Sequence, residues 1–296
     1  MILTKLQGGL GNQMFQYAAA RGLLKKESQV YLDHSFLDEN FKDTEHFTAR
    51  KYELHIFKNI KAGKATLKQI NLFKKPSAYL KALIYFSKGF FRLLQQQGNE
   101  FVSLPNPVNN QYLYLDGYFQ SEEYFKHCRE ELLKEFQFPE LDLVNKVAHQ
   151  NITDVPNAVS IHIRRGDYLK SKVVSDIHGV LPIDYYQKAI EFLQNKLSPL
   201  TLFVFSDDVA WAQANLSTDN LATHYINHNQ GEDSWKDMAL MSYCRHHIIA
   251  NSSFSWWAAW LNPSLDKIVI APKNWFSDPQ LNSQSQTIIP DTWITL

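Results

Sequence analysis

Short apolar runs separated by helix-like segments recur along the first 35 residues. Residues 2–7 alternate between apolar and polar positions, as expected of a short strand, and the glycines of Gly8-Gly9-Leu10-Gly11 end it. From Asn12 onward the apolar spacing predicts a helix, and residues 30–33 predict a second strand. The chain therefore opens as a strand, a glycine loop, a helix and a strand.

The central third of the chain is less regular. Residues 36–57 show no clear period, whereas residues 80–94 have the apolar spacing of a helix with basic flanks. Residues 112–119 read as a strand, and Ser121 is a suitable N-cap for a helix that reaches about residue 136. Pro139, Asp154 and Pro156 lie in a stretch, 137–157, that predicts a domain boundary.

Beyond that boundary, strands and helices alternate. Strands are predicted at 158–163, 202–205, 223–226, 247–250 and 268–271, with helices at 184–197, 208–214, 233–244 and 254–261. Alternation of this kind is typical of a parallel sheet covered by helices on both faces. We predict an α/β protein of two Rossmann-type lobes with a cleft between them, an N-terminal lobe at 1–150 and a C-terminal lobe at 151–296.

Composition and charge narrow the function classes. The 296 residues are 45% hydrophobic and carry no net charge, so no global field draws the protein to nucleic acid. Cys128 and Cys244 are the only cysteines, which excludes a disulfide framework and a cysteine-based zinc site. The start of the sequence lacks the pattern of a signal peptide, and no apolar run approaches the roughly 20 residues of a membrane span, so we expect a cytoplasmic protein.

The segment 58–92 is basic, with no acidic residue between Glu53 and Glu100. One interpretation is a helix packed on its domain with a solvated lysine face. The alternative is weak docking on an anionic membrane surface.

The glycine loop favours a ligand close to the backbone, since it comes between a strand and a helix N-terminus. Asp33, at the end of the second strand, lies about where a dinucleotide fold places its ribose-binding acid, which raises a nucleotide-dependent oxidoreductase as an alternative. Against it, Met14 stands where a G-x-G-x-x-G fingerprint needs a small residue. A plain tight turn is the simplest interpretation of the glycines.

The segment from His162 to Tyr168 follows the first strand of the second lobe and contains Arg164, Arg165 and Asp167. Adjacent strand residues point apart, so the two guanidinium groups diverge. A diphosphate would match their planar donor geometry, with one arginine binding it and the other paired to Asp167. A purely structural Arg–Asp pair is the alternative.

Two further strand ends carry polar residues. Ser206-Asp207-Asp208 resembles a metal-binding Asp-x-Asp, but its acids are adjacent, and helix capping by Ser206 or Asp207 is the competing interpretation. Ser252 and Ser253 are natural N-caps whose helix could hold a phosphate, with Phe254 placed to stack on a base or sugar. The tryptophans that follow are more typical of a core.

Together these motifs resemble the family 11 glycosyltransferases, the α-1,2-fucosyltransferases. The matching segments are 8–18, 116–121, 162–168, 206–208 and 251–260. The resemblance implies GDP-β-L-fucose as donor, inversion to an α-fucoside, a GT-B-like fold and no metal or cofactor. It also implies a galactose-terminated oligosaccharide as acceptor, fucosylated at its 2-hydroxyl. The N-terminal lobe, 1–150, is then expected to form the acceptor side, and the C-terminal lobe, 151–296, to bind GDP-fucose.

The resemblance assigns the donor diphosphate to Arg164 and Arg165, with Arg164 also taken as catalytic. Further donor contacts are implied for the remaining motif positions, namely Gly9, Gly11, Asn12, His162, Asp207, Ser252, Ser253 and Phe254. Where some relatives carry a carboxylate base, this chain has Lys172, so Asp167 and His178 stay as alternative bases. A non-catalytic sugar-binding protein is a third function class, and the sequence determines neither the acceptor glycan nor the oligomeric state.

Overall fold

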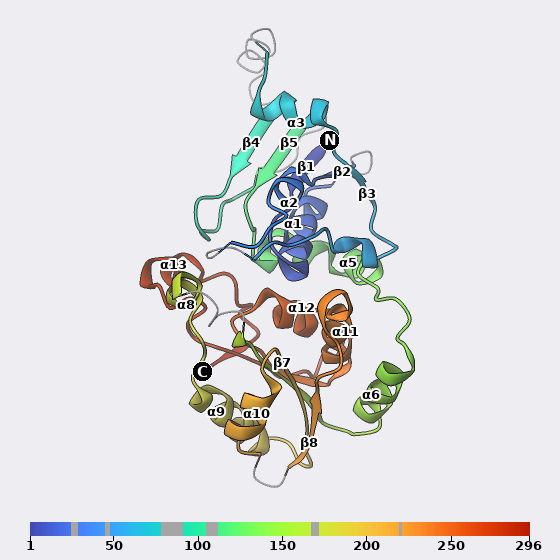
Figure 1. Cartoon of the computed structure of the whole chain (residues 1–296), viewed down its shortest axis with the longest axis vertical. Helices are drawn as coiled ribbons and strands as arrows, with labels where there is room; N and C mark the ends of the chain where they lie inside the picture. Colours follow the sequence, from blue (N-terminus) through green and yellow to red (C-terminus); the bar gives the residue numbers. More distant parts are fainter. Residues whose placement is uncertain (25–28, 45–47, 78–90, 105–111, 167–171, 219–220) are drawn as a thin grey trace. The chain divides into compact units, whose positions relative to one another are not determined.

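The computed structural model describes residues 1–24, 29–44, 48–77, 91–104, 112–166, 172–218 and 221–296. The chain divides into two compact units (Figure 1). The first comprises Met1–Pro139 with Gln284–Ile288, and the second comprises Glu140–Ser283 with Ile289–Leu296. The division after residue 139 lies within the predicted boundary stretch and precedes the predicted lobe limit at 150.

The first unit is built on a parallel sheet of five strands in the order β3-β2-β1-β5-β4 (Figure 1). Its strands are β1 (Ile2–Lys5), β2 (Val30–Asp33), β3 (Ala62–Lys64), β4 (Phe91–Gln95) and β5 (Tyr112–Asp116). The chain adds β2 and β3 on one side of β1, and β5 and β4 on the other. The strand order therefore reverses between β1 and β5.

In the described residues of the first unit, the helices are α1 (Leu10–Gly22), α2 (Ser35–Glu39), α3 (Leu67–Lys74) and α5 (Arg129–Glu135), with the 3-10 turns η1 (Leu54–Ile56), η2 (Glu122–Tyr124) and η3 (Lys126–Cys128). The continuous helix predicted after Ser121 is broken. Ser121 does cap, since its hydroxyl accepts from the Glu123 N–H, but it caps η2. Phe125, with φ −145°, leaves the helical region, and α5 begins four residues later.

The predicted helix at 80–94 is wrong at its C-terminal end. Residues 91–95 form strand β4, which pairs with β5 from Phe91↔Tyr112 to Gln95↔Asp116. Phe91 and Tyr112 stack with ring centroids 4.8 Å apart. Residues 78–90, which carry the rest of that prediction, lie outside the described residues.

The second unit contains a six-stranded parallel sheet in the order β11-β10-β9-β6-β7-β8. Its strands are β6 (Ala158–Ile163), β7 (Thr201–Ser206), β8 (Ala222–Ile226), β9 (His246–Ile248), β10 (Val269–Ala271) and β11 (Ile294–Thr295). The other elements of this part of the chain are α6 (Leu143–Thr153), α8 (Lys172–His178), α9 (Ile183–Gln194), α10 (Val209–Asn215), η4 (Gly231–Asp233), α11 (Trp235–Tyr243), α12 (Ser253–Leu261) and α13 (Pro279–Gln284). Here the order reverses between β6 and β9.

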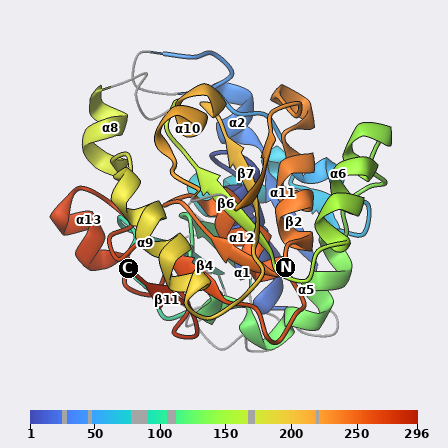
Figure 2. The same cartoon turned by 90° about the horizontal axis from the view of Figure 1, so that it is seen from below.

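Helices cover both faces of this sheet. Apolar residues of β6, β7, β9 and β10 form one core cluster with α9 and α10, and Figure 2 shows α9 and α11 on opposite sides of β6. The α12 residues Trp256, Trp257 and Trp260 are buried and pack on one another, as expected of core residues. Two units, each with a parallel Rossmann-type sheet, confirm the predicted GT-B-like α/β class. In the described part of the chain, no helix combines the length and apolar character that a membrane span requires.

Candidate functional site

The candidate donor site lies where the strand order of the second sheet reverses. The carboxyl end of β6 leads into Arg164 and Arg165, and the neighbouring strand β9 leads into the serine turn at Ser252 and Ser253. In open parallel sheets, ligands bind beyond the carboxyl ends of the strands at such a reversal. The fold thus brings together two of the motifs that the sequence analysis singled out.

Both arginines are paired with carboxylates at the end of β7. Arg164 Nε lies 3.4 Å from Asp207 Oδ2, and Arg165 Nε lies 3.6 Å from Asp208 Oδ2. The Arg165 guanidinium also lies over the ring of Trp211 on α10, with its central carbon 4.3 Å from the ring centroid. The arginine side chains are about a quarter exposed, so they stay accessible to a ligand.

Asp207 also fixes the backbone of the turn formed by Arg164, Arg165 and Gly166, which we call the arginine turn. Its Oδ1 accepts hydrogen bonds from the N–H groups of Arg165, at 2.8 Å, and Gly166, at 2.9 Å. A Cβ on Gly166 would lie 3.3 Å from the Asp207 carbonyl oxygen, so this close approach favours glycine. Asp207, predicted to bind the donor, thus holds the residues that follow β6.

The predicted pairing of an arginine with Asp167 cannot be assigned, since residues 167–171 lie outside the described residues. Among the described residues, Asp207 and Asp208 are partners of the two arginines. The predicted cap of α10 is also corrected: Asp208 is the N-cap, accepting from the Trp211 N–H at 3.1 Å, and Ser206 Oγ accepts from the Asp208 N–H. In the described part of the chain, no group of three or more His, Cys, Asp or Glu residues gathers as metal ligands would.

The serine turn after β9 begins α12. Ser252 is the N-cap, and its hydroxyl accepts from the Phe254 N–H at 3.3 Å. Ser252, Ser253 and Phe254 are half-buried, which leaves the first turn of the helix accessible. The N–H groups of a helix start attract anions.

His162, on β6, contacts two residues of the first turn of α12. Its Nδ1 lies 2.9 Å from Ser255 Oγ, and its ring centroid lies 5.8 Å from that of Phe254. Burial and the nearby Arg164 charge lower the pKa of His162 to about 3, so the ring is neutral at physiological pH. His162 therefore has a structural role at this turn, and its donor contact stays a prediction.

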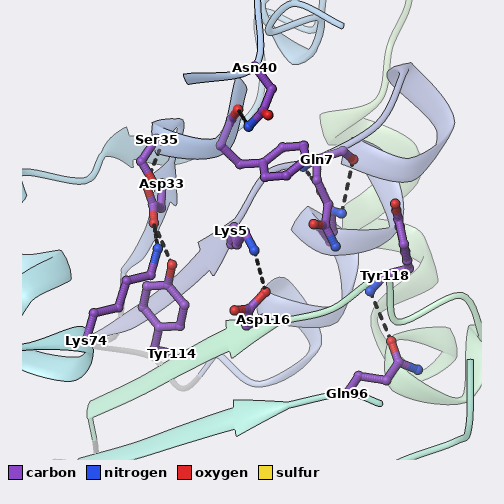
Figure 3. Close-up of polar contacts among 12 residues, drawn as sticks. Lys5, Gln7, Asp33, Ser35, Asn40, Lys74, Gln96, Tyr114, Asp116 and Tyr118 are labelled. Carbon is purple, nitrogen blue, oxygen red and sulfur yellow. Dashed lines mark hydrogen bonds and ion pairs between the residues drawn. The ribbon is translucent and has the colours of Figure 1, made fainter. Parts of the chain in front are cut away.

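The first sheet has a corresponding reversal between β1 and β5. Lys5 Nζ and Asp116 Oδ1, at the ends of these strands, form a 3.0 Å ion pair (Figure 3). Beyond β1, Gly8 adopts φ +76° and packs against Asn12. Asn12 Oδ1 accepts from Gln120 Nε2, beyond β5, at 2.8 Å. The glycine loop thus fixes Asn12 against the second matching motif of the first unit.

The α1 helix begins at Leu10, two residues earlier than predicted, with Gly9 as N-cap. A Cβ on Gly9 would lie 3.9 Å from Glu53 Oε2, and the Glu53 carboxyl accepts a hydrogen bond from the Leu10 N–H. A carboxyl therefore already meets this helix start, and the donor contacts of Gly9 and Gly11 stay predictions. Burial raises the pKa of Glu53 despite the nearby Arg50 charge.

Asp33 argues against the oxidoreductase alternative. It is fully buried, and its carboxylate accepts from Tyr114 Oη at 2.5 Å and the Ser35 N–H at 2.8 Å, with Lys74 Nζ at 3.3 Å (Figure 3). Burial alone would raise the pKa of Asp33, but these donors and the Lys74 charge bring it below its ordinary value. A carboxylate engaged in this way has a structural role rather than that of a ribose ligand.

His178, one of the two predicted bases, lies at the end of α8. Its ring centroid is 5.4 Å from that of Phe276. Burial and the Arg164 charge lower the pKa of His178, so it is neutral at pH 7 and able to accept a proton. The fold therefore places it within electrostatic reach of the arginine turn, whereas Asp167 lies outside the described residues.

The sequence analysis singled out Asp208 in a motif but not as an arginine partner, and it missed Trp211 and Glu53. Asp208 and Trp211 hold Arg165, and Glu53 meets the start of α1. The contact of Asp208 follows from the β6–β7 register, which pairs Ile163 with Ser206, because in a parallel pair the residues after these positions lie at the same level. Nothing in the sequence near Glu53 indicates its contact.

Comparisons with known proteins agree with these motifs. The E. coli O-antigen biosynthesis glycosyltransferase WbnK is 39% identical over 98% of this chain and 99% of its own length. An E. coli alpha-1,2-colitosyltransferase is 32% identical over 100% of this chain and 99% of its own length. The human galactoside alpha-(1,2)-fucosyltransferase 1 is 27% identical over 55% of this chain and 45% of its own length. The family model of glycosyl transferase family 11 matches residues 1–296. This chain belongs to glycosyl transferase family 11.

Proposed function

We propose that the protein transfers L-fucose from GDP-β-L-fucose to the 2-hydroxyl of a terminal galactose, with inversion to an α-1,2-fucoside. The observation that carries the proposal is the arginine turn: Arg164 and Arg165 follow β6 at the strand-order reversal, held there by Asp207 and Asp208. A guanidinium has five N–H donors, and these ion pairs involve the Nε edge of each. The half-buried start of α12 follows the neighbouring strand.

The proposed reaction is a single displacement. The acceptor oxygen forms a bond to the anomeric carbon, the bond from that carbon to the β-phosphate oxygen breaks, and its electron pair leaves with GDP. Arg164, Arg165 and the N–H group of Ser253, the first residue of α12, would stabilise the charge that grows on the phosphate more strongly in the transition state than in the ground state. The acceptor proton goes to a base, for which His178 is the described candidate.

We propose that this chemistry needs neither metal nor cofactor, because GDP is a good leaving group and arginine and helix N–H groups match its charge. Full activity after dialysis against EDTA is the expected result. Loss of activity on EDTA treatment that added Mg²⁺ or Mn²⁺ restores would contradict it.

Transfer of colitose is the second candidate, favoured by the 32% identity to an alpha-1,2-colitosyltransferase. Colitose is fucose without its 3-hydroxyl. A site that hydrogen-bonds this hydroxyl would reject colitose strongly, whereas a site with no such contact would accept both sugars.

The decisive experiment incubates the protein with GDP-fucose or GDP-colitose and a panel of galactosides, and reads products by mass and linkage. An α-1,2-fucosyl galactoside, formed faster than its colitosyl counterpart, is expected. Preference for GDP-colitose would select the second candidate. Absence of transfer together with GDP binding would indicate a non-catalytic protein. Binding of NADH in place of GDP would support the alternative function as a nucleotide-dependent oxidoreductase.

Membrane association through segment 58–92 is a separate hypothesis. Two of its described lysines already have carboxylate partners: Lys64 with Asp38 at 3.6 Å and Lys74 with Asp33 at 3.3 Å. Other lysines of the segment, such as Lys58 and Lys68, are exposed. Sedimentation with anionic vesicles, compared between the parent and a variant with Lys58 and Lys68 changed to Gln, tests it; equal binding would contradict it.

A further inference from the structure

The second unit contains a cavity of about 550 Å³ that none of the motifs predicted. It lies beyond the carboxyl end of β10 and beside the first turn of α9. Its volume falls within the range of small-molecule sites, roughly 300–1,000 Å³. Tyr185 forms part of the wall, with its hydroxyl donating to the carbonyls of Ile249 and Ile270, so the cavity is joined to β9 and β10.

The side chains around the cavity suit an uncharged sugar. Phe276 provides an aromatic ring, and Asp184, Lys188, Lys273 and Asn274 provide polar groups of both kinds. A hexose offers one apolar C–H face and several hydroxyls that both donate and accept, so a ring beside mixed polar groups matches it.

His178 connects the cavity to the donor site. It lines the cavity, and the charge of Arg164 acts on it. Its backbone position is fixed: the Ser277 N–H donates to Ile177 O at 3.0 Å, and Asn251 Nδ2 donates to His178 O at 2.7 Å. Asn251 immediately precedes the serine turn, so one side chain links that turn to the base candidate.

Gly179, next to His178, adopts φ +68° and packs against Ser277, where a Cβ would overlap the Ser277 hydroxyl. This positive φ turns the chain sharply at the end of α8. His178 and Gly179 both line the cavity at this turn.

We propose that this cavity is the acceptor-sugar subsite, and that His178 receives the proton of the attacking hydroxyl held there. The inference rests on the proposed function and extends it to the acceptor. The proton passes from the acceptor oxygen to an imidazole nitrogen as the oxygen bonds to the anomeric carbon, and then to water. Asn251 acts as a positioning residue.

Steady-state kinetics test the subsite. Asp184→Ala and Lys188→Ala are expected to raise the acceptor KM about tenfold each, the effect of one lost hydrogen bond of ordinary strength. The affinity for GDP, from calorimetry, should not change. Glu191→Ala and Lys196→Ala remove the same charges from exposed positions outside the cavity lining and should leave both quantities at the parent values.

Direct occupancy gives a second measurement. Cys128 and Cys244 are both buried, so a Lys188→Cys variant offers one exposed thiol. The galactoside acceptor should slow its reaction with a maleimide several-fold, and GDP alone should not. A Lys196→Cys variant should react at the same rate with and without acceptor.

His178→Ala is expected to lower kcat about 100-fold and to remove the fall in rate at acid pH that protonation of a base causes. If GDP, but not the acceptor, protects Lys188→Cys, the cavity binds the donor. If neither ligand protects the thiol and the acceptor KM values of the variants stay unchanged, the proposed acceptor subsite is wrong. These outcomes presuppose transfer by the parent enzyme. A parent that transfers no sugar refutes the proposed function instead.

Discussion

Asn145 and Asn229 exchange two hydrogen bonds through their side-chain amides, with N···O distances of 2.9 and 2.8 Å. Asn145 lies on α6 and Asn229 precedes η4. Asn229 Nδ2 also donates to Asp237 Oδ1 on α11, at 2.7 Å. This buried network attaches α6 to the second unit and explains why the chain divides before that helix.

The network makes stability dependent on pH through Asp237. Burial raises the pKa of Asp237 to about 7, whereas the unfolded carboxyl titrates near its ordinary value of about 4. Between these values the folded state binds more protons, so the free energy of unfolding falls as the pH rises from 4 to 7 and is then constant. Asp237→Asn should remove this fall in the free energy of unfolding, which is on the order of 2–4 kcal/mol. Urea unfolding of parent and variant at pH 5 and pH 8 measures the effect.

The comparison between parent and variant cancels the titration of other groups. The difference in free energy of unfolding between them should be larger at pH 8 than at pH 5. Parallel pH profiles would show that Asp237 does not titrate in this range.

The arginine turn gives the sharpest prediction on activity. Arg164→Ala should lower transfer on the order of 100- to 1,000-fold while thermal unfolding stays at the parent value, because a donor to the phosphate charge is lost. Arg245→Ala, which removes an exposed arginine paired with Asp266 in the same unit, is the matched control and should keep full activity.

Arg165→Ala should lose nearly as much activity and, in addition, about 1 kcal/mol of stability, because the contact with Trp211 is lost. Transfer assays and thermal unfolding on the same preparations separate the two effects. Substantial transfer by both arginine variants would exclude their role at the diphosphate.

Glu135 holds the first unit together from a buried position. It accepts from Tyr17 Oη at 2.7 Å and from Arg21 Nε at 2.9 Å. Glu135→Ala leaves both donors without this partner and should lower the free energy of unfolding by about 3–5 kcal/mol, measured by urea unfolding. Lys126→Ala removes an exposed ion pair with Glu123 and should cost less than about 1 kcal/mol. Equal losses would show that burial of Glu135 does not matter.

Gly8→Ala tests the glycine loop. A methyl group there combines a positive φ of +76° with overlap against the Asn12 amide, so Asn12 must leave Gln120. Gly231→Ala introduces a similar strain, at φ +58°, with no atom within 4 Å of the new Cβ. Both should lose about 1 kcal/mol from strain, and the Gly8 variant should lose more stability and also activity. Identical behaviour of the two variants would remove any special role of Asn12.

Much of the sheet was predictable from the sequence. Strands β2 and β6 have the predicted bounds, because each is a short, mostly apolar run that stops at a charged residue: β2 ends at Asp33, and Arg164 follows β6. Helix α6 was missed, because its exposed face carries Leu143, Val144 and Val147 while its buried face includes Asn145. Its buried face carries only two apolar residues, Ala148 and Ile152, so its apolar pattern does not indicate the buried face, which the amide network of Asn145 helps to fix.

The candidate site was predictable in its residue types and less so in its contacts. The divergence of Arg164 and Arg165 followed from strand geometry, but their partners depend on the pairing of β6 with β7. The cavity at His178 depends on two segments that lie far apart in the sequence, 178–188 and 272–277, which no local pattern connects.

The hydrogen bonds by which Asp207 holds the arginine turn have a consequence for turnover. Asp207 holds the backbone of Arg165 and Gly166 through hydrogen bonds within the protein itself, so the turn is already shaped before a ligand arrives. If the diphosphate binds there as proposed, the turn favours the fully developed charge of free GDP over the less charged donor ester. The spent nucleotide would then compete with fresh donor, and an enzyme that hydrolyses GDP would accelerate synthesis.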